Sequence, residues 1–124
     1  MSLRVTGLDH VQITAPEELV DEVLDYYRDC LGLEALDKPE GTSAAGGWFR
    51  IGLAELHISV TPDNPPKTAH FGITVDDFGA TVERLRECGV HIEQARLIPG
   101  RTRCYTRDPA GNRIEILSYN SGAG

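Results

Sequence analysis

Two stretches of the chain alternate apolar and polar residues in the same way. They cover residues 8–14 and 68–74, and each places a histidine, an isoleucine and a threonine at matching positions. Successive side chains of a β-strand point to opposite faces, so both stretches predict strands with the histidine on the polar face. A second matched pair of alternating stretches lies at 54–59 and 112–117. With two copies only, the pattern predicts an internal duplication rather than a repeat array.

After the first strand of each copy, apolar residues recur at spacings of three and four, which predicts an amphipathic helix. Pro16 suits the first turn of the first helix, with Thr14 or Ala15 as its cap, and Asp76 or Asp77 is expected to cap the second. Three short strands are then expected in each copy, at 33–37, 47–52 and 54–60 and at 90–95, 101–107 and 112–118. Each copy therefore reads β-α-β-β-β.

Length and charge narrow the class of protein. The 124 residues suit one domain, 1–124, made of a first module at about 5–61 and a second at about 68–119. The net charge of -7 argues against a nucleic-acid surface, which needs clustered lysine and arginine. No apolar run approaches the roughly 20 residues of a membrane span, and the N-terminus lacks the layout of a secretory signal. These features predict a cytoplasmic protein that binds neither nucleic acid nor membrane.

The cysteines support the same compartment. Cys30, Cys88 and Cys104 are odd in number and show no C-x-x-C spacing. Such a set suits a reducing compartment better than a disulfide framework. Each is expected to be a small buried apolar residue.

The polar faces of the predicted strands hold the candidate chemistry. They carry His10, Gln12, Glu55, His57, Ser59, His70, Thr74, Arg113 and Glu115. Such a set is costly to bury unless it is solvated, paired or bound to an ion. Two imidazoles and a carboxylate with a fourth donor suit one divalent first-row ion, such as zinc, nickel, manganese, cobalt or Fe(II). The predicted ligands are His10, His57, His70 and Glu115, with Glu55 as the alternative to His57.

Four segments carry a resemblance to a known family. They are Leu8-Asp9-His10-Val11 and the stretches 25–33, 69–77 and 108–116. On these the chain resembles the vicinal oxygen chelate superfamily, which includes glyoxalase I, bleomycin-binding proteins and extradiol dioxygenases. The resemblance implies an α+β fold of two βαβββ modules, which form a cupped eight-stranded mixed sheet with helices on its outer face. It carries the family's ligand positions onto His10, His70 and Glu115, and the repeat favours His57 over Glu55 for the fourth.

The resemblance also implies a function. It suggests a metal-dependent lyase, isomerase or epimerase that chelates the vicinal oxygens of a small substrate and stabilises an enediolate or oxyanion. Glu115 would be both ligand and base, and Glu55 is the other catalytic candidate. The candidate substrate-binding residues are Gln12, Trp48, Arg50, Thr74, Arg103 and Tyr105.

Two other readings stay open. One is a metal-free protein that binds a small molecule or antibiotic, as bleomycin-resistance proteins do. The other, ranked third after the enzyme of glyoxalase type and the binding protein, is an extradiol-type dioxygenase in which His10, His70 and Glu115 alone hold iron. A homodimer is expected, and the site lies either within one chain or across a two-fold axis, where His10 and His57 would face His70 and Glu115 of a second copy.

Overall fold

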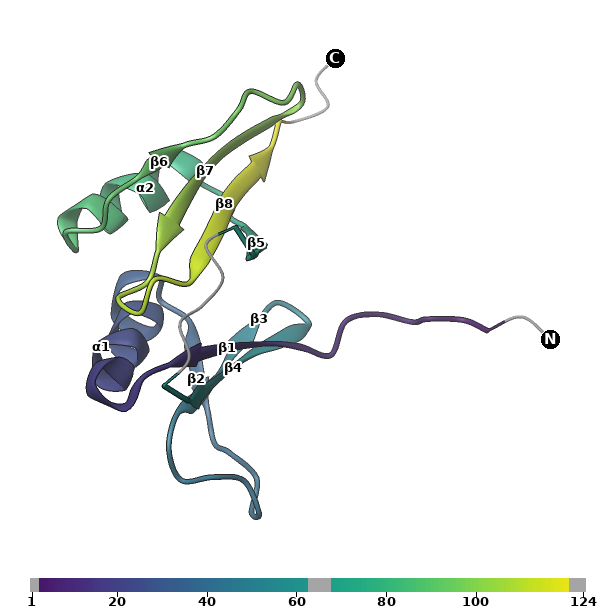
Figure 1. The fold of residues 1–124 in the computed structure, drawn as a ribbon. Helices are drawn as coiled ribbons and strands as arrows, with labels where there is room; N and C mark the ends of the chain where they lie inside the picture. Colours follow the sequence, from purple (N-terminus) through teal and green to yellow (C-terminus); the bar gives the residue numbers. More distant parts are fainter. Residues whose placement is uncertain (1–2, 63–67, 121–124) are drawn as a thin grey trace.

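The computed structural model describes residues 3–62 and 68–120, which form two modules of similar plan (Figure 1). Module 1 contains β1 (His10–Ala15), η1 (Glu17–Leu19), α1 (Val20–Asp25), η2 (Tyr26–Cys30), β2 (Glu34–Leu36), β3 (Gly47–Ile51) and β4 (Ala54–Val60). Module 2 contains β5 (His70–Thr74), α2 (Phe78–Glu87), β6 (Glu93–Gln94), β7 (Arg101–Arg107) and β8 (Arg113–Tyr119). The predicted α+β fold of two βαβββ modules is confirmed.

The strands form two separate four-stranded sheets. Their orders are β1-β4-β3-β2 and β5-β8-β7-β6, with the first pair of each parallel and the others antiparallel. The predicted eight-stranded sheet is therefore divided within one chain. Among the described residues, β1 pairs only with β4 and β5 only with β8, so each sheet ends in an edge strand.

The helix starts are partly as predicted. Asp77 caps α2, because its Oδ1 accepts a hydrogen bond of 2.9 Å from the Ala80 amide. The predicted cap of the first helix is wrong. Thr14 and Ala15 remain in β1, and Pro16 takes the cap position with extended backbone and no capping side chain. The chain then enters a 3-10 turn, and the first helical segment ends in a π-helical turn at η2.

The apolar strand faces pack under the helices, as the alternation predicts. Leu56, Ile58, Ile114 and Ile116 are almost fully buried, and they belong to one core with Tyr27. Because side chains alternate along a strand, burying this face turns the polar residues of β1, β4, β5 and β8 to the other face. The fold therefore sets the candidate ligands apart from the core.

A buried hydrogen-bond network joins the two modules. The Tyr27 hydroxyl donates to Asp108 Oδ2 over 2.8 Å, and Asn112 Nδ2 donates to the same oxygen and to the Thr14 carbonyl. Asp108 Oδ1 accepts from the amides of Ala110 and Asn112. Burial raises the pKa of the Asp108 carboxyl above its ordinary value, and these hydrogen bonds oppose that rise. The network fixes η2 against the turn between β7 and β8.

A disulfide also links the modules, which corrects the expectation of three unpaired cysteines. Cys30 at the end of η2 is bonded to Cys88 at the end of α2, and Cys104 is buried and unpaired. The two bonded cysteines are 58 residues apart, the same offset that relates His57 to Glu115. They occupy equivalent positions of the duplication and meet where the modules pack.

Ahead of β1, residues 3–9 form an extended arm that projects from the body of the molecule (Figure 1). Leu3 and Val5 on this arm are 91% and 96% exposed. Among the described residues, no helix is long and apolar enough to span a membrane.

Tyr27→Phe tests the network between the modules. Removing this donor from a buried carboxylate should lower the free energy of unfolding by about 1–3 kcal/mol at pH 7. Because the Tyr27 hydrogen bond lowers the pKa of Asp108, the deficit should shrink at pH values low enough to protonate the carboxyl. Urea denaturation at pH 7 and at that lower pH measures the free energy of unfolding of wild type and variant, with the exposed Tyr119→Phe as control. Equal deficits at both pH values would contradict the assignment.

The disulfide is tested by counting thiols. Alkylation of the unfolded, non-reduced protein should label Cys104 alone, and reduction should raise the count from one to three. Intact-mass measurement gives both counts directly. Three labelled cysteines before reduction would show that Cys30 and Cys88 are not bonded.

Candidate functional site

Module 1 brings its two histidines into one stack of rings. In the parallel pairing of β1 with β4, Gln12 lies beside His57, and Trp48 of β3 lies on the other side of His57. The His57 ring stacks on Trp48 with centroids 3.7 Å apart and on His10 with centroids 4.2 Å apart. The ring planes of the two histidines differ by only 15°.

Glu55 contacts this stack from the same strand face. Its Oε1 lies 2.9 Å from His57 Nε2, and the two side chains are 28% and 12% exposed. Glu55 is also the register partner of His10 across the parallel pair. The two predicted alternatives for the fourth ligand, His57 and Glu55, are therefore hydrogen-bonded to each other.

Both first-strand histidines are held at Nδ1. His10 Nδ1 lies 2.8 Å from Asp9 Oδ2, and His70 Nδ1 lies 3.1 Å from the Thr68 carbonyl oxygen. Both partners are acceptors, so Nδ1 is the donor in each ring. The neutral form then carries its lone pair on Nε2, which is the arrangement found in metal-binding histidines whose other nitrogen is hydrogen-bonded.

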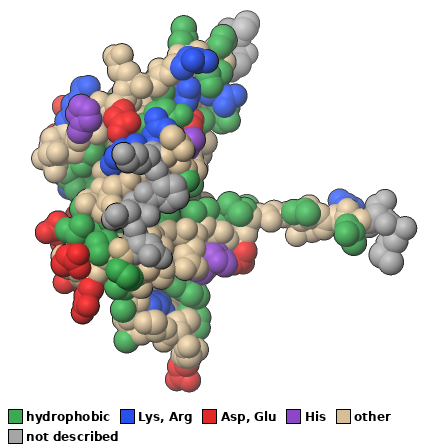
Figure 2. Space-filling view, viewed as in Figure 1, with side chains coloured by type: hydrophobic (Ala, Val, Ile, Leu, Met, Phe, Trp, Pro, Cys, Tyr) green, Lys and Arg blue, Asp and Glu red, His purple; other side chains and the backbone are tan. Residues whose placement is uncertain are grey.

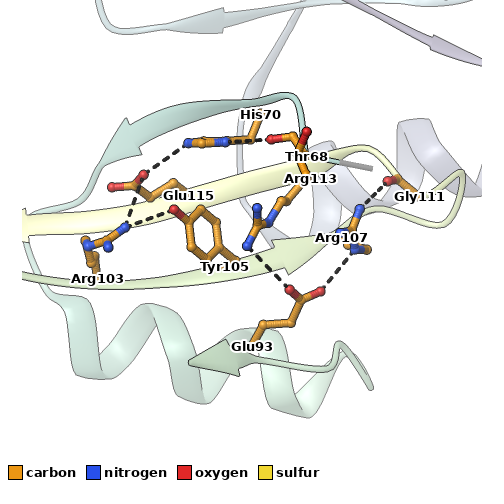
Figure 3. Close-up of polar contacts among 9 residues, drawn as sticks. All are labelled: Thr68, His70, Glu93, Arg103, Tyr105, Arg107, Gly111, Arg113 and Glu115. Carbon is orange, nitrogen blue, oxygen red and sulfur yellow. Dashed lines mark hydrogen bonds and ion pairs between the residues drawn. The ribbon is translucent and has the colours of Figure 1, made fainter. Parts of the chain in front are cut away.

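Module 2 pairs His70 with Glu115 (Figure 3). His70 Nε2 lies 3.3 Å from Glu115 Oε1, and the carboxylate is 15% exposed. Since Nδ1 of His70 donates to a carbonyl, a neutral ring presents a lone pair to a carboxylate oxygen. These two atoms attract each other only if a proton or a cation lies between them. Gly72, the register partner of Glu115, contributes no side chain over this carboxylate.

Arginines and a tyrosine surround the module 2 pair. Arg103 Nη1 donates to the Tyr105 hydroxyl over 3.0 Å and lies 3.6 Å from Glu115 Oε1. The Arg113 guanidinium lies 3.6 Å from the centre of the Tyr105 ring (Figure 3). The Tyr105 and His70 rings are in a T-shaped arrangement, with centroids 5.1 Å apart. We call this group the module 2 half-site: His70, Arg103, Tyr105, Arg113 and Glu115. The module 1 half-site is the group of His10, Trp48, Glu55 and His57. Arginine side chains supply the positive charge of the module 2 half-site, whereas stacked rings dominate the module 1 half-site.

The two half-sites do not merge into one cluster within a chain. In the ranges 3–62 and 68–120, no three His, Cys, Asp or Glu side chains are grouped so as to hold an ion. A cavity of about 320 Å³ between β1 and β5 is lined by Gln12 and His70. A second, of about 420 Å³, lies against Trp48, His57 and Gln12, and residues 38–45 contribute to its wall.

The predicted substrate contacts do not all line these cavities. Arg50 on β3 is the register partner of Glu55, lies 3.7 Å from Glu34 and lines neither cavity. Thr74, at the exposed end of β5, lines neither of them. Gln12 lines both cavities and Trp48 lines the second. Arg103 and Tyr105 line neither of them, and Arg103 lies beside Glu115 and bonds to the Tyr105 hydroxyl.

Several partners of these residues were missed from the sequence. Asp9 accepts the hydrogen bond from His10 Nδ1 and directly precedes this predicted ligand in the sequence. A carboxylate next to a candidate metal-binding histidine is a signal that could have predicted this contact. Arg113 shares a strand face with Glu115, so its position was readable, but its contact with Tyr105 depends on the pairing of β7 with β8. The Thr68 carbonyl carries no signal, because every residue has one.

Comparisons with known proteins agree with this fold. Residues 7–116 match the model of the Glyoxalase/Bleomycin resistance protein/Dioxygenase superfamily. Glyoxylase I 4 of Arabidopsis thaliana is 28% identical over 96% of this chain and 74% of its own length. A glyoxalase family protein from Bacillus anthracis is 34% identical, with a TM-score of 0.89 over 97% of this chain and all of that one. TnmS3, an antibiotic binding protein from Streptomyces sp. CB03234, has the same fold at 19% identity, with a TM-score of 0.74 over 96% of this chain and 100% of its own.

His57→Ala tests the ring stack. The chain has one tryptophan, so its intrinsic emission reports on Trp48 alone. Removing the ring that lies 3.7 Å from the indole should shift the emission to the red and raise its quenching by acrylamide. His91→Ala, at an exposed histidine, is the control. Unchanged emission in His57→Ala would show that the two rings are not stacked in solution.

Proposed function

Because the chain belongs to the glyoxalase/bleomycin resistance protein/dioxygenase superfamily, we propose that it is a metal-dependent enzyme of the glyoxalase type. Its substrate is a small molecule with two vicinal oxygens, and its reaction is a lyase, isomerase or epimerase step. One observation carries the proposal: each module holds a histidine at Nδ1 and places a carboxylate on the same polar strand face.

The atoms of module 2 fit a divalent ion. His70 Nε2 and Glu115 Oε1 are 3.3 Å apart, within reach of one cation at the usual bond lengths of about 2.0–2.2 Å. A cation between them would also remove the repulsion between the Nε2 lone pair of a neutral His70 and the Glu115 carboxylate oxygen. Imidazole nitrogen and carboxylate oxygen are donors that zinc, nickel, manganese, cobalt and Fe(II) accept.

In module 1 the geometry supports Glu55 over His57 as the fourth donor. A metal lies in the plane of the imidazole that binds it, along the lone pair of nitrogen. His10 and His57 are stacked face to face at 4.2 Å, so their lone pairs lie in nearly parallel planes and do not converge on one ion. We therefore assign His10, His70, Glu115 and Glu55 as the ligand set, with His57 orienting Glu55 through its 2.9 Å contact.

A second copy of the chain completes the site in this proposal. The half-sites belong to different modules that do not form one cluster, while β1 and β5 end their sheets as edges. The arm before β1 exposes Leu3, Val5 and Leu8, which a second copy would bury in a homodimer. Pairing module 1 of one copy with module 2 of the other brings both half-sites together about a two-fold axis.

The residues divide the chemistry between them. A bound divalent cation would stabilise negative charge on the two vicinal oxygens of the substrate. We assign proton transfer to Glu55, because its Oε1 is positioned by His57 Nε2 at 2.9 Å. Trp48 and Gln12 line the cavity beside His57, where they orient the body of the substrate and exclude water.

One observation favours a second function. The cavity of about 420 Å³ beside Trp48 and His57 has an indole and an imidazole in its wall, which suits a flat ligand held without metal. TnmS3, which shares the fold, is an antibiotic binding protein. A sequestering protein would bind its ligand equally well with and without divalent ions.

Metal analysis separates the two functions. Protein purified without chelators should contain one divalent ion per chain, and His10→Ala and Glu115→Ala should each lose it, while His91→Ala should keep it. Glu55→Gln should weaken metal binding more than His57→Gln. Wild-type protein that binds no zinc, nickel, manganese, cobalt or Fe(II) in titrations would contradict the enzymatic proposal.

Mixing variants tests the shared site. If each site combines module 1 of one copy with module 2 of another, a heterodimer of His10→Ala and Glu115→Ala has one intact site and one doubly altered site. Unfolding and refolding the two variants together should therefore restore about a quarter of the wild-type metal content. Restoration of none would place the site within one chain.

A further inference from the structure

Arg103 is the counter-ion of Glu115 in the described structure. Its side chain is only 9% exposed, with Nη1 3.6 Å from Glu115 Oε1 and 3.0 Å from the Tyr105 hydroxyl. Nη2 donates to the Arg96 carbonyl over 2.8 Å, and Nε is buried without a partner among the described residues. These contacts hold the guanidinium in one place beside the module 2 half-site (Figure 3).

The oxygen that faces Arg103 is the one that faces His70. Glu115 Oε1 lies 3.3 Å from His70 Nε2 and 3.6 Å from Arg103 Nη1. A divalent ion taken up by His70 and Glu115 would use this oxygen and would bring two positive charges close to a third. The guanidinium would then lose the carboxylate that balances it, in a place where little water can reach.

The surrounding residues do not supply a replacement anion. The polar face of β7 and β8 carries Arg101, Arg103, Arg107 and Arg113. Glu93, the other carboxylate near this face, lies 3.0 Å from Arg107 Nε and 3.9 Å from Arg113 Nη2. Basic side chains gather over this module in Figure 2, although the whole chain has a net charge of -7. Within the described part of the chain, Glu115 is the one carboxylate in an ion pair with Arg103.

We propose that Arg103 binds an anionic group of the substrate and that this binding is linked to metal binding, because Glu115 leaves Arg103 when it takes the ion. The substrate is thus an organic acid whose carboxylate or phosphonate lies near its vicinal oxygens. Anion and metal strengthen each other's binding, and the linkage is reciprocal. The inference rests on the proposed function, since it requires an ion at His70 and Glu115.

The test measures the dissociation constant of Mn²⁺ with and without methylphosphonate, by electron paramagnetic resonance of the unbound ion. In the wild-type protein the anion should tighten Mn²⁺ binding by about 5–100-fold, the usual range of such couplings. In Arg103→Gln, Mn²⁺ alone should bind at least about tenfold more tightly than in wild type, and methylphosphonate should have no effect. Arg103→Lys, which keeps the charge, should retain a weaker linkage.

Arg101→Gln is the matched control. Arg101 lies on the same face of β7, two positions away, and its guanidinium is over the Tyr119 ring rather than Glu115. This variant should show the wild-type linkage. Circular dichroism verifies that each variant is folded, and the wild-type measurement tests the linkage without any substitution.

The outcomes separate the two proposals. Wild-type protein that binds Mn²⁺ with an affinity independent of methylphosphonate overturns the role of Arg103 and leaves the metal site standing. If methylphosphonate still tightens Mn²⁺ binding in Arg103→Gln, the role of Arg103 is likewise overturned and the metal site is left standing. Protein that binds neither Mn²⁺ nor any other divalent ion overturns the proposed function and this inference together.

Discussion

The buried carboxylate of Asp108 is the constraint on which the arrangement of the modules depends. Burial alone disfavours its charged form, so it is stable only where several donors converge on it. Those donors come from η2, through Tyr27, and from the turn between β7 and β8, through Asn112. The carboxylate therefore fixes one module against the other, and the Asn112 contact with the Thr14 carbonyl adds the end of β1. The cavity between β1 and β5 follows from this packing.

Duplication gives the modules one framework, and substitution within it gives them different chemistry. In module 1 the polar face carries stacked rings and a carboxylate bonded to a histidine. In module 2 the equivalent face carries a histidine, a carboxylate and several arginines. This asymmetry would orient a substrate between the half-sites, with its uncharged part against Trp48 and its anionic group against Arg103. A symmetric pair of half-sites would not distinguish the two ends.

Much of the fold could be predicted because strand alternation and helix periodicity are local properties. The polar faces with His10, His57, His70 and Glu115 follow from a period of two, and the Asp77 cap follows from its position before an apolar stripe. Contacts between distant segments were not accessible in this way. The Cys30–Cys88 bond was missed because the spacing of cysteines does not show which chain ends meet in space, although both lie at equivalent points of the repeat.

The sequence by itself determined which residues share the polar faces, since that depends only on the direction of successive side chains. It did not determine their contacts. Whether His57 stacks on His10 or shares an ion with it depends on the parallel register of β1 and β4, and whether Arg103 balances Glu115 depends on the pairing of β7 with β8. Only the tertiary structure decided these points, because distances of a few ångströms between strands arise from packing of the whole module and not from any local pattern.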